Sequence, residues 1–212
     1  MRRYATELIG TYFLLLTIGL AVTTMNALAP VAIGGILMVM IYAGGHISGA
    51  HFNPAVTLAV LIRGRIQGAD AGGYILAQLL GGLAGAMTSQ LILDNAKPTA
   101  LSPTGREIWM ALAVEALFTF ALAYVVLNVA TSRSHPDNSF YGLAIGSTVL
   151  VGVITVGGIS GAAFNPAVAF GGAAIGLFAW SAIWIHLLAQ AIGATLAATA
   201  FLALSEQDRE PA

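Results

Sequence analysis

The sequence predicts an all-α membrane protein with six transmembrane helices plus two re-entrant half-helices, arranged in two inverted repeats. Three observations lead to this fold class. Of the 212 residues, 58% are hydrophobic and only 8% are charged, against roughly 25% charged in an ordinary soluble domain. Six apolar stretches are long enough to cross a bilayer. One short polar sequence occurs almost unchanged twice, as HFNPAV at 51–56 and AFNPAV at 163–168.

Composition excludes several classes of function. The formal net charge is −1, so no excess of positive charge indicates a nucleic-acid partner. The chain has no cysteine, which excludes disulfides, thiol catalysis and thiolate metal sites. No nucleophile–base pair and no cluster of metal ligands stands out in the sequence. We therefore expect no enzymatic activity, no metal site and no cofactor.

The first apolar stretch, 4–24, is predicted to be a retained span and not a signal peptide. Arg2 and Arg3 precede it, and Ala27-Leu28-Ala29 resembles a cleavage site. However, Pro30 would directly follow the cut, which is unusual. The stretch also has a counterpart in the middle of the chain, where no signal peptide can lie.

The other spans are bounded by turn-forming and polar segments. We expect them at about 30–48, 69–93, 107–130, 140–158 and 178–203. The interrupting segments are Met25-Asn26, Arg63-Gly64-Arg65, DNAKPTALSPTG at 94–105 and SRSHPDN at 132–138. Two further apolar segments, 53–62 and 165–176, are too short to cross a bilayer.

The chain repeats itself. When it is shifted by 112 residues, GHISGAHFNPAV at 45–56 aligns without a gap on GGISGAAFNPAV at 157–168. The same shift places Ala77-Gln78 on Ala189-Gln190 and Gly81 on Gly193, and a shift of 108 places Glu7 on Glu115. We therefore expect one domain, 1–212, built from a repeat at about 4–93 and a second at about 107–203.

Each repeat holds three spans, an odd number, so it ends on the opposite side of the membrane from its start. The second repeat must then be inverted relative to the first. The distribution of Lys and Arg places both termini in the cytoplasm. That side would hold Arg2, Arg3, Arg63, Arg65, Arg133 and Arg209, and the other side only Lys97 and Arg106.

Asn53-Pro54-Ala55 and Asn165-Pro166-Ala167 are each predicted to start a short helix. Asn is a favoured N-cap, and Pro suits the first helical position because its missing N–H has no helical partner there. Ten helical residues span roughly 15 Å, half of the ~30 Å hydrocarbon core. A single Asn-Pro would be explained equally well by a cap in a loop, but two copies in matched inverted positions favour half-helices that meet near the midplane.

The preceding segments, 45–52 and 157–164, are rich in glycine and cannot all be helical. Non-helical backbone at membrane depth persists only where it is buried in protein or lines a wet cavity. We expect their carbonyls to supply acceptors and the two Asn amides to supply donors along a narrow aqueous path. The positive ends of the two half-helices would face each other at its centre and disfavour cations, including hydronium.

These motifs, with a Glu in the first span of each half, resemble the aquaporin (major intrinsic protein) family, of the bacterial type. The resemblance covers all six spans. It implies a right-handed six-helix bundle with two re-entrant half-helices, and homotetramers with one pore in each protomer. It also implies a multi-pass protein of the cell (inner) membrane that lets water or small neutral solutes permeate passively.

Five polar residues inside the predicted membrane region allow alternatives. Glu7 and Glu115 could form a proton relay or could be static acceptors for N–H groups of the re-entrant loops, and the resemblance supports the second role. The resemblance places His51 in the cytoplasmic vestibule and gives His46 a part in bracing the loop. The pore loop and vestibule would also include Gly45, Gly49, Gly157 and Gly161. His186, alone in the last span, is expected to be packed or near the lipid interface.

The sequence departs from the family at the outer constriction. Most members carry an arginine directly after the second Asn-Pro-Ala, where this chain has Val168. By the family's gapless spacing, the other three filter positions fall at Ile33, Val153 and Ala162, so all four are apolar. This departure puts strict water selectivity in doubt and removes a positive charge that helps to repel cations.

Several functions remain open at this point. The first is a passive channel for water and small uncharged solutes, including glycerol-like polyols and undissociated acids such as arsenous acid, that excludes ions and protons. A strict water channel is the alternative within this class. A proton-coupled secondary transporter is the second class, because inverted repeats are common there too. A non-conducting structural membrane protein is the third.

Overall fold

The computed structural model describes residues 1–96 and 98–208, so Lys97 and Arg209 of the charge argument lie outside the described residues. The described chain is helical apart from its loops, as the sequence predicted. Its six long helices are α1 (Arg2–Thr23), α2 (Ala29–Ser48), α4 (Gly68–Ile92), α5 (Arg106–Val126), α6 (Tyr141–Ser160) and α8 (Ile183–Leu204). The two short ones are α3 (Pro54–Ile62) and α7 (Pro166–Ala174). Single turns of other helix types are η1 (Leu127–Thr131), η2 (Trp180–Ala182) and η3 (Glu206–Asp208).

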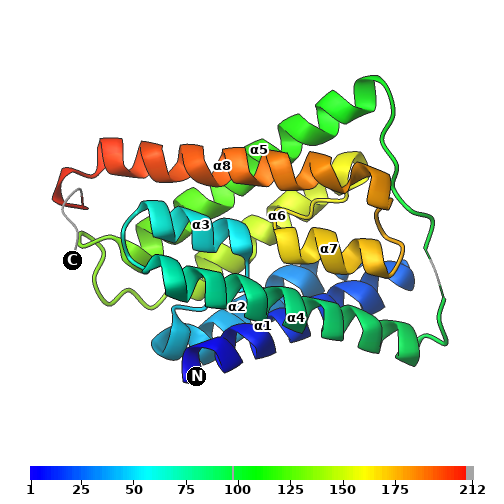
Figure 1. The fold of residues 1–212 in the computed structure, drawn as a ribbon, viewed down its shortest axis with the longest axis horizontal. Helices are drawn as coiled ribbons and strands as arrows, with labels where there is room; N and C mark the ends of the chain where they lie inside the picture. The colour runs from blue at the N-terminus through cyan, green and yellow to red at the C-terminus, as the bar shows by residue number, and fades with distance from the viewer. Residues whose placement is uncertain (97, 209–212) are drawn as a thin grey trace.

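The two short helices lie one after the other through the middle of the bundle, and neither crosses it (Figure 1). Each is inserted into the opposite repeat: α3 packs against α5 and α8, and α7 packs against α1 and α4. Each short helix also packs against a long helix of its own repeat, α3 on α4 and α7 on α8, so the short helices join the two halves.

Glycines let the long helices approach closely. A Cβ atom at Gly34 of α2 would lie 2.7 Å from the Gly146 carbonyl oxygen of α6, and one at Gly146 would lie 2.5 Å from the Gly34 oxygen. On α4, Gly81 and Gly85 likewise lie so close to the backbone of α1 that an added Cβ atom would clash with it. This Gly-x-x-x-Gly pair thus serves packing within the chain, as small residues do between membrane helices.

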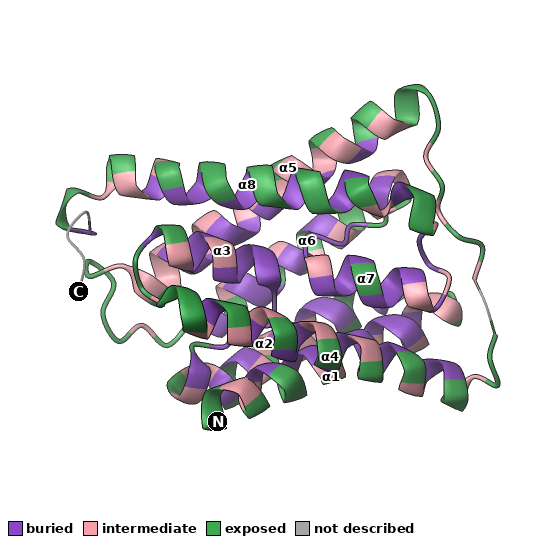
Figure 2. Ribbon diagram, viewed as in Figure 1, coloured by how far each residue is buried: buried purple, intermediate pink, exposed green. Residues whose placement is uncertain are grey.

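The outward faces of the long helices are apolar. Figure 2 shows exposed positions along the outside of α4, α5 and α8, and buried ones along the inside. Large apolar side chains are exposed on these faces, among them Leu76, Leu80, Leu117, Ile154 and Leu196. All six long helices are long and apolar enough to cross a membrane. The chain is therefore a multi-pass membrane protein.

The ends of α2 and α6 agree with the prediction that the glycine-rich segments before the short helices cannot all be helical. Residues 45–48 and 157–160 remain helical, so the non-helical backbone before each short helix is only 49–52 and 161–164. Gly49 and Gly161 end α2 and α6 in the left-handed conformation, with φ of +84° and +82°. Glycine at this C-terminal position accepts a positive φ without a steric penalty, so each helix continues up to it.

The start of α1 and η3, the last described element, lie toward one end of the bundle, which we call the terminal face, and the described part of the α4–α5 loop lies at the other, the opposite face (Figure 1). At the terminal face, Asp208 of η3 joins distant segments. Its carboxylate pairs with the buried Arg63 guanidinium at the end of α3 and accepts hydrogen bonds from Ser132 Oγ at 2.9 Å and Arg133 N at 3.1 Å. Phe201 of α8 lies under the guanidinium, 5.2 Å from ring centre to Cζ. We call these five residues the C-terminal clasp.

The clasp lowers the pKa of the Asp208 carboxylate. Burial alone would raise the pKa of Asp208, but the hydrogen bonds from Arg133 N and Ser132 Oγ, together with the Arg63 charge, outweigh burial and hold this pKa below its ordinary value. The folded-state pKa is therefore lower than the unfolded one. The resulting stabilisation is present above the unfolded pKa of about 3.9 and is lost as the pH falls through the lower folded value.

Replacing Asp208 with Asn should lower the free energy of unfolding by about 3–5 kcal/mol, because the change leaves the buried Arg63 charge without its counter-charge. Equilibrium unfolding of the purified protein in detergent measures this. Glu206→Gln, an exposed change in the same turn, is the matched control and should have little effect. The difference between wild type and Asp208→Asn should stay constant from about pH 5 upward and shrink below about pH 4. Equal stability of the two proteins at neutral pH would show that the clasp is not a stabilising element.

Candidate functional site

The two Asn-Pro pairs begin the short helices as predicted. Asn53 caps α3, and its side-chain oxygen accepts the N–H groups of Ala55 at 2.8 Å and Val56 at 3.3 Å. Asn165 caps α7 in the same way and accepts the Ala167 N–H at 2.9 Å. Each carbonyl oxygen is thus used within its own half, which orients the amide nitrogen toward the other half.

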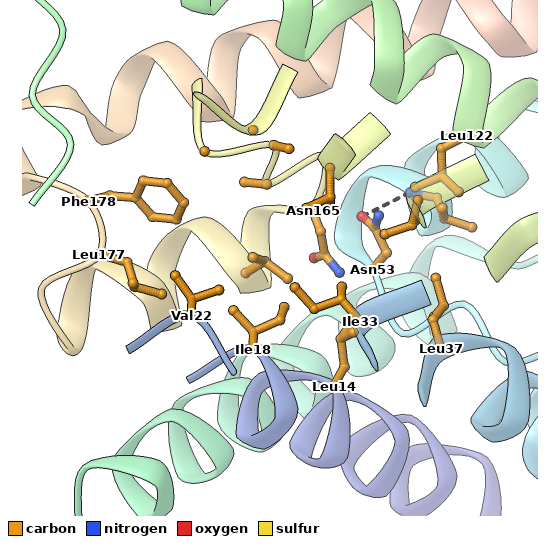
Figure 3. A pocket seen from close by; sticks show the side chains of 18 of the residues that line it. Leu14, Ile18, Val22, Ile33, Leu37, Asn53, Leu122, Asn165, Leu177 and Phe178 are labelled. Atoms are coloured by element: carbon orange, nitrogen blue, oxygen red, sulfur yellow. Dashed lines mark hydrogen bonds between the residues drawn. The ribbon is translucent and has the colours of Figure 1, made fainter. Parts of the chain in front are cut away.

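The amide nitrogens link the two halves at the centre. Asn53 Nδ2 donates to the Phe164 carbonyl oxygen at 2.9 Å, and Asn165 Nδ2 donates to the Phe52 carbonyl oxygen at 2.9 Å. An amide NH₂ carries two hydrogens, so each Asn retains a second donor after this bond. Both side chains line the central cavity, where Figure 3 shows them near its middle.

The segments before the short helices have an unusual backbone. Ala50 and Phe52 have φ near +50°, at 50° and 48°, and their counterparts Ala162 and Phe164 have φ of 51° and 48°. The left-handed region costs a residue with a Cβ roughly 1–2 kcal/mol. The same strained path occurs in both repeats, so something in each repeat must hold it.

In the first repeat, Glu7 of α1 holds this path. Its carboxylate accepts four hydrogen bonds: from Ser48 Oγ at 2.7 Å, His51 N at 3.0 Å, Phe52 N at 2.7 Å and Gln78 Nε2 at 2.8 Å. The side chain is completely buried. Two loop N–H groups that could not be solvated at this depth are thereby satisfied.

In the second repeat, Glu115 of α5 receives the same four kinds of donor. They are Ser160 Oγ at 2.7 Å, Ala163 N and Phe164 N at 2.9 Å each, and Gln190 Nε2 at 2.9 Å. We call Glu7 and Glu115 with their four donors the loop anchors. The serine and glutamine donors were not identified from the sequence, although the 112-residue shift aligns each with its counterpart.

One position beside the anchors differs between the repeats. Tyr74 of α4 donates to the Ser48 carbonyl oxygen at 2.7 Å, and the 112-residue shift places His186 of α8 in this position. His186 is 1% exposed and packed inside the bundle, away from the lipid interface. Its Nδ1 lies 3.5 Å from Glu115 Oε1, and its ring centre lies 4.7 Å from that of Phe178.

The central cavity has a volume of about 230 Å³, and both Asn side chains line it. All four residues predicted for the outer constriction line it: Ile33, Val153, Ala162 and Val168. Gly157 and Gly161 line it too. Among the described lining residues, the polar side chains are only His51, Asn53, Thr99 and Asn165, and none is Lys, Arg, Asp or Glu. The wall is otherwise apolar, as the side chains around the two Asn in Figure 3 illustrate.

A second cavity of about 520 Å³ continues toward the terminal face. It shares the lining residues His51 and Val126 with the central cavity, so the two cavities adjoin at these residues. Gly45, His46 and Gly49 line this second cavity. Within the described part of the chain, no hydrogen bond ties His46 to the loop. His51 Nδ1 lies 3.1 Å from Thr57 Oγ1 of α3.

Sequence reasoning missed the lining at the opposite face. Pro98, Thr99 and Leu101 of the α4–α5 loop line the central cavity together with Leu177 and Phe178. No motif marks these positions, because a loop's path depends on what it packs against. No three His, Cys, Asp or Glu side chains gather as a metal site anywhere in the described residues.

Comparisons with known proteins agree with this geometry. A family model described as "Major intrinsic protein" matches residues 1–201. The glycerol uptake facilitator protein-like 6 of Lactiplantibacillus plantarum is 40% identical and is matched over 98% of this chain and 100% of its own length. Aquaporin NIP1-1 of Zea mays is 38% identical over 95% of this chain and 74% of its own length. The X-ray structure of an aquaglyceroporin from Plasmodium falciparum superimposes with a TM-score of 0.80 over 98% of both chains, at 20% identity.

Replacing Glu7 or Glu115 with Gln should reduce the yield of folded protein and its stability, by about 1–3 kcal/mol for each donor left without an acceptor. The reason is that an amide NH₂ would face groups that themselves donate. Thermal unfolding in detergent measures the loss, and Glu107→Gln on the exposed start of α5 is the control. Variants that fold normally but lose a pH-dependent transport step would instead support the proton-relay interpretation.

Proposed function

The chain belongs to the major intrinsic protein family and is a membrane channel for water and small solutes, not an enzyme. From this premise we propose that its pore is not restricted to water. It passes water together with small uncharged solutes, such as glycerol-like polyols and undissociated metalloid acids such as arsenous acid. It excludes ions and protons.

One observation carries this proposal. Ile33, Val153, Ala162 and Val168 all line the central cavity, and none of them offers a side-chain donor or a charge. We propose that these four residues form the selectivity filter. A solute crossing this level can exchange hydrogen bonds only with backbone groups, so its size decides more than its hydrogen-bonding pattern. The name of the glycerol uptake facilitator-like relative supports a pore that is not restricted to water.

Exclusion of ions is proposed from the centre of the cavity. The N-terminal ends of α3 and α7 meet there, and each carries a partial positive charge of about half a unit. The described lining residues include no Asp or Glu that could offset this potential. Neutral solutes would instead meet the second N–H of Asn53 and of Asn165.

The loop anchors argue against proton coupling. Glu7 and Glu115 each accept four hydrogen bonds as carboxylates, and neither lines the central cavity. A carboxylate saturated with donors is a structural acceptor more than a carrier of protons. We propose passive permeation accordingly.

Three further properties are proposed on the same basis. The excess of arginine at the terminal face supports an orientation with both termini in the cytoplasm. Membership of the family supports a homotetramer in which each protomer has its own pore. The cell membrane is the proposed location.

Stopped-flow light scattering on proteoliposomes tests the function directly. Water, glycerol and arsenous acid should each permeate faster than through protein-free liposomes. Water permeation alone would establish a strict water channel. Uptake that collapses with a protonophore would indicate a coupled transporter, and liposomes no more permeable than empty ones would indicate a structural protein.

Replacing Asn53 or Asn165 with Asp should sharply reduce the flux of neutral solutes or admit cations. A carboxylate removes the donor to the carbonyl of the other half and adds negative charge at the centre. Solute flux and cation leak in proteoliposomes measure both effects. Asn26→Asp in the α1–α2 loop is the control, because Asn26 is exposed and lines neither cavity, and its side-chain oxygen accepts the Leu28 N–H at 2.9 Å, as an Asp oxygen also can. Unchanged flux together with unchanged ion exclusion in both central variants would remove these residues from the pore.

Replacing Val168 with Arg should lower glycerol and arsenous acid permeability more than water permeability. The longer side chain would occupy part of the filter and bring up to five N–H donors and a charge. The ratio of glycerol to water permeability, at matched protein per liposome, measures the change. The matched variant is Val168→Leu, which adds bulk at the same position without adding a charge. A wild type that already excludes glycerol would place the narrowest point elsewhere.

A further inference from the structure

We propose that Phe178 is a further specificity-determining residue, which forms a second, outer layer of the constriction beyond the four apolar filter residues. This inference rests on the proposed function, because it assigns a role within the same pore. Phe178 follows α7 in the loop that leads to η2. Its side chain is only 5% exposed, yet it lines the central cavity. Figure 3 shows its ring beside Leu177, toward one end of the cavity.

The ring covers both segments that carry filter residues. Gly172 lies four residues after Val168 on α7, so the two positions share one face of that helix. A Cβ atom at Gly172 would lie only 2.6 Å from Phe178 Cε2. One at Gly161, directly before Ala162, would lie 2.4 Å from Phe178 Cε1. The ring therefore fills space that a side chain at either glycine would require, one turn after Val168 on α7 and directly beside Ala162 in the loop.

Backbone hydrogen bonds on both sides of Phe178 hold the loop that carries the ring. Leu101 N donates to the Leu177 carbonyl oxygen at 2.9 Å, and Ala179 N donates to the Leu101 carbonyl oxygen at 3.0 Å. These two bonds flank Phe178 and tie its loop to the α4–α5 loop, which lines the same end of the cavity.

The ring is also supported from behind. The imidazole of His186 packs against it at a tilt of 52°, with ring centres 4.7 Å apart, and His186 is itself 1% exposed. A close-packed neighbour of this kind leaves no space into which the ring could withdraw. One face of the Phe178 ring is thus packed against His186, while the residue lines the central cavity.

The chemistry of the ring determines what it selects. A phenyl group offers no N–H or O–H donor, so it adds bulk without adding a hydrogen-bond partner. A solute that passes it loses solvation on the side that faces the ring, and this loss grows with the number of hydroxyl groups on that side. The outer layer therefore sets an upper limit on polyol length, while the filter beneath it leaves three-carbon solutes free to pass.

The test compares water, glycerol and the four-carbon polyol erythritol in proteoliposomes of wild type, Phe178→Ala and Phe178→Leu. Phe170→Ala is the matched control, because Phe170 lies on α7 but packs on Trp180, is 37% exposed and does not line the central cavity. Ratios of permeability are the readout, since a ratio does not change when only part of the protein is folded. Phe178→Leu retains much of the apolar bulk and serves if Phe178→Ala fails to fold.

We expect the erythritol-to-water ratio to rise roughly tenfold or more in Phe178→Ala, the scale on which a pocket discriminates by about one methylene, and by less in Phe178→Leu. The glycerol-to-water ratio should rise less than the erythritol ratio, and Phe170→Ala should match wild type. A permeable wild type whose ratios are unchanged in both Phe178 variants would overturn this inference alone. A wild type that passes none of the three solutes would overturn the proposed function and this inference together.

Discussion

In each repeat, one buried carboxylate receives four hydrogen bonds, and the remainder of the pore architecture depends on this interaction. The loops that the anchors hold contain non-glycine residues in the left-handed conformation, Ala50 and Phe52 in the first repeat. Such a path is costly and leaves N–H groups without helical partners at a depth where water cannot solvate them. Glu7 compensates for both, because it accepts the N–H groups of His51 and Phe52 directly. The position of the following Asn, and so the start of the short helix, is fixed as a consequence.

The anchors also explain why the two halves fold as one unit. Glu7 and Glu115 belong to the long helices α1 and α5, whereas the short helices that they position also pack against long helices of the other repeat. The reciprocal bonds from Asn53 and Asn165 to carbonyls of the opposite half close this arrangement at the centre. Each short helix therefore has packing partners in both repeats. At the terminal face the C-terminal clasp adds a contact of the same kind, between the end of α3 and a segment that follows α8.

The scaffold is symmetric, but the lining is not. Counterparts in the two repeats carry the same anchors, whereas His51 and Thr57 of the first repeat correspond to Ala163 and Ala169 of the second. The half of the path toward the terminal face therefore has a polar pair at the junction of the two cavities. The other half has an apolar wall, apart from Thr99, and this wall includes the ring of Phe178. One structural plan used twice thus yields two mouths of different chemistry.

The sequence by itself determined the six spans, the two short helices and the inversion of the repeats. These features follow from local or periodic signals: the length of an apolar run, an Asn-Pro cap, and a gapless self-alignment. The same alignment with the family's spacing also named four residues that line one cavity. Only the tertiary structure decided which donors meet Glu7 and Glu115, that His186 is packed against Glu115 and Phe178, and that Asp208 pairs with Arg63. The physical reason is that these contacts join side chains far apart in the chain. Their partners are set by how helices and loops pack in space, which no short stretch of sequence encodes.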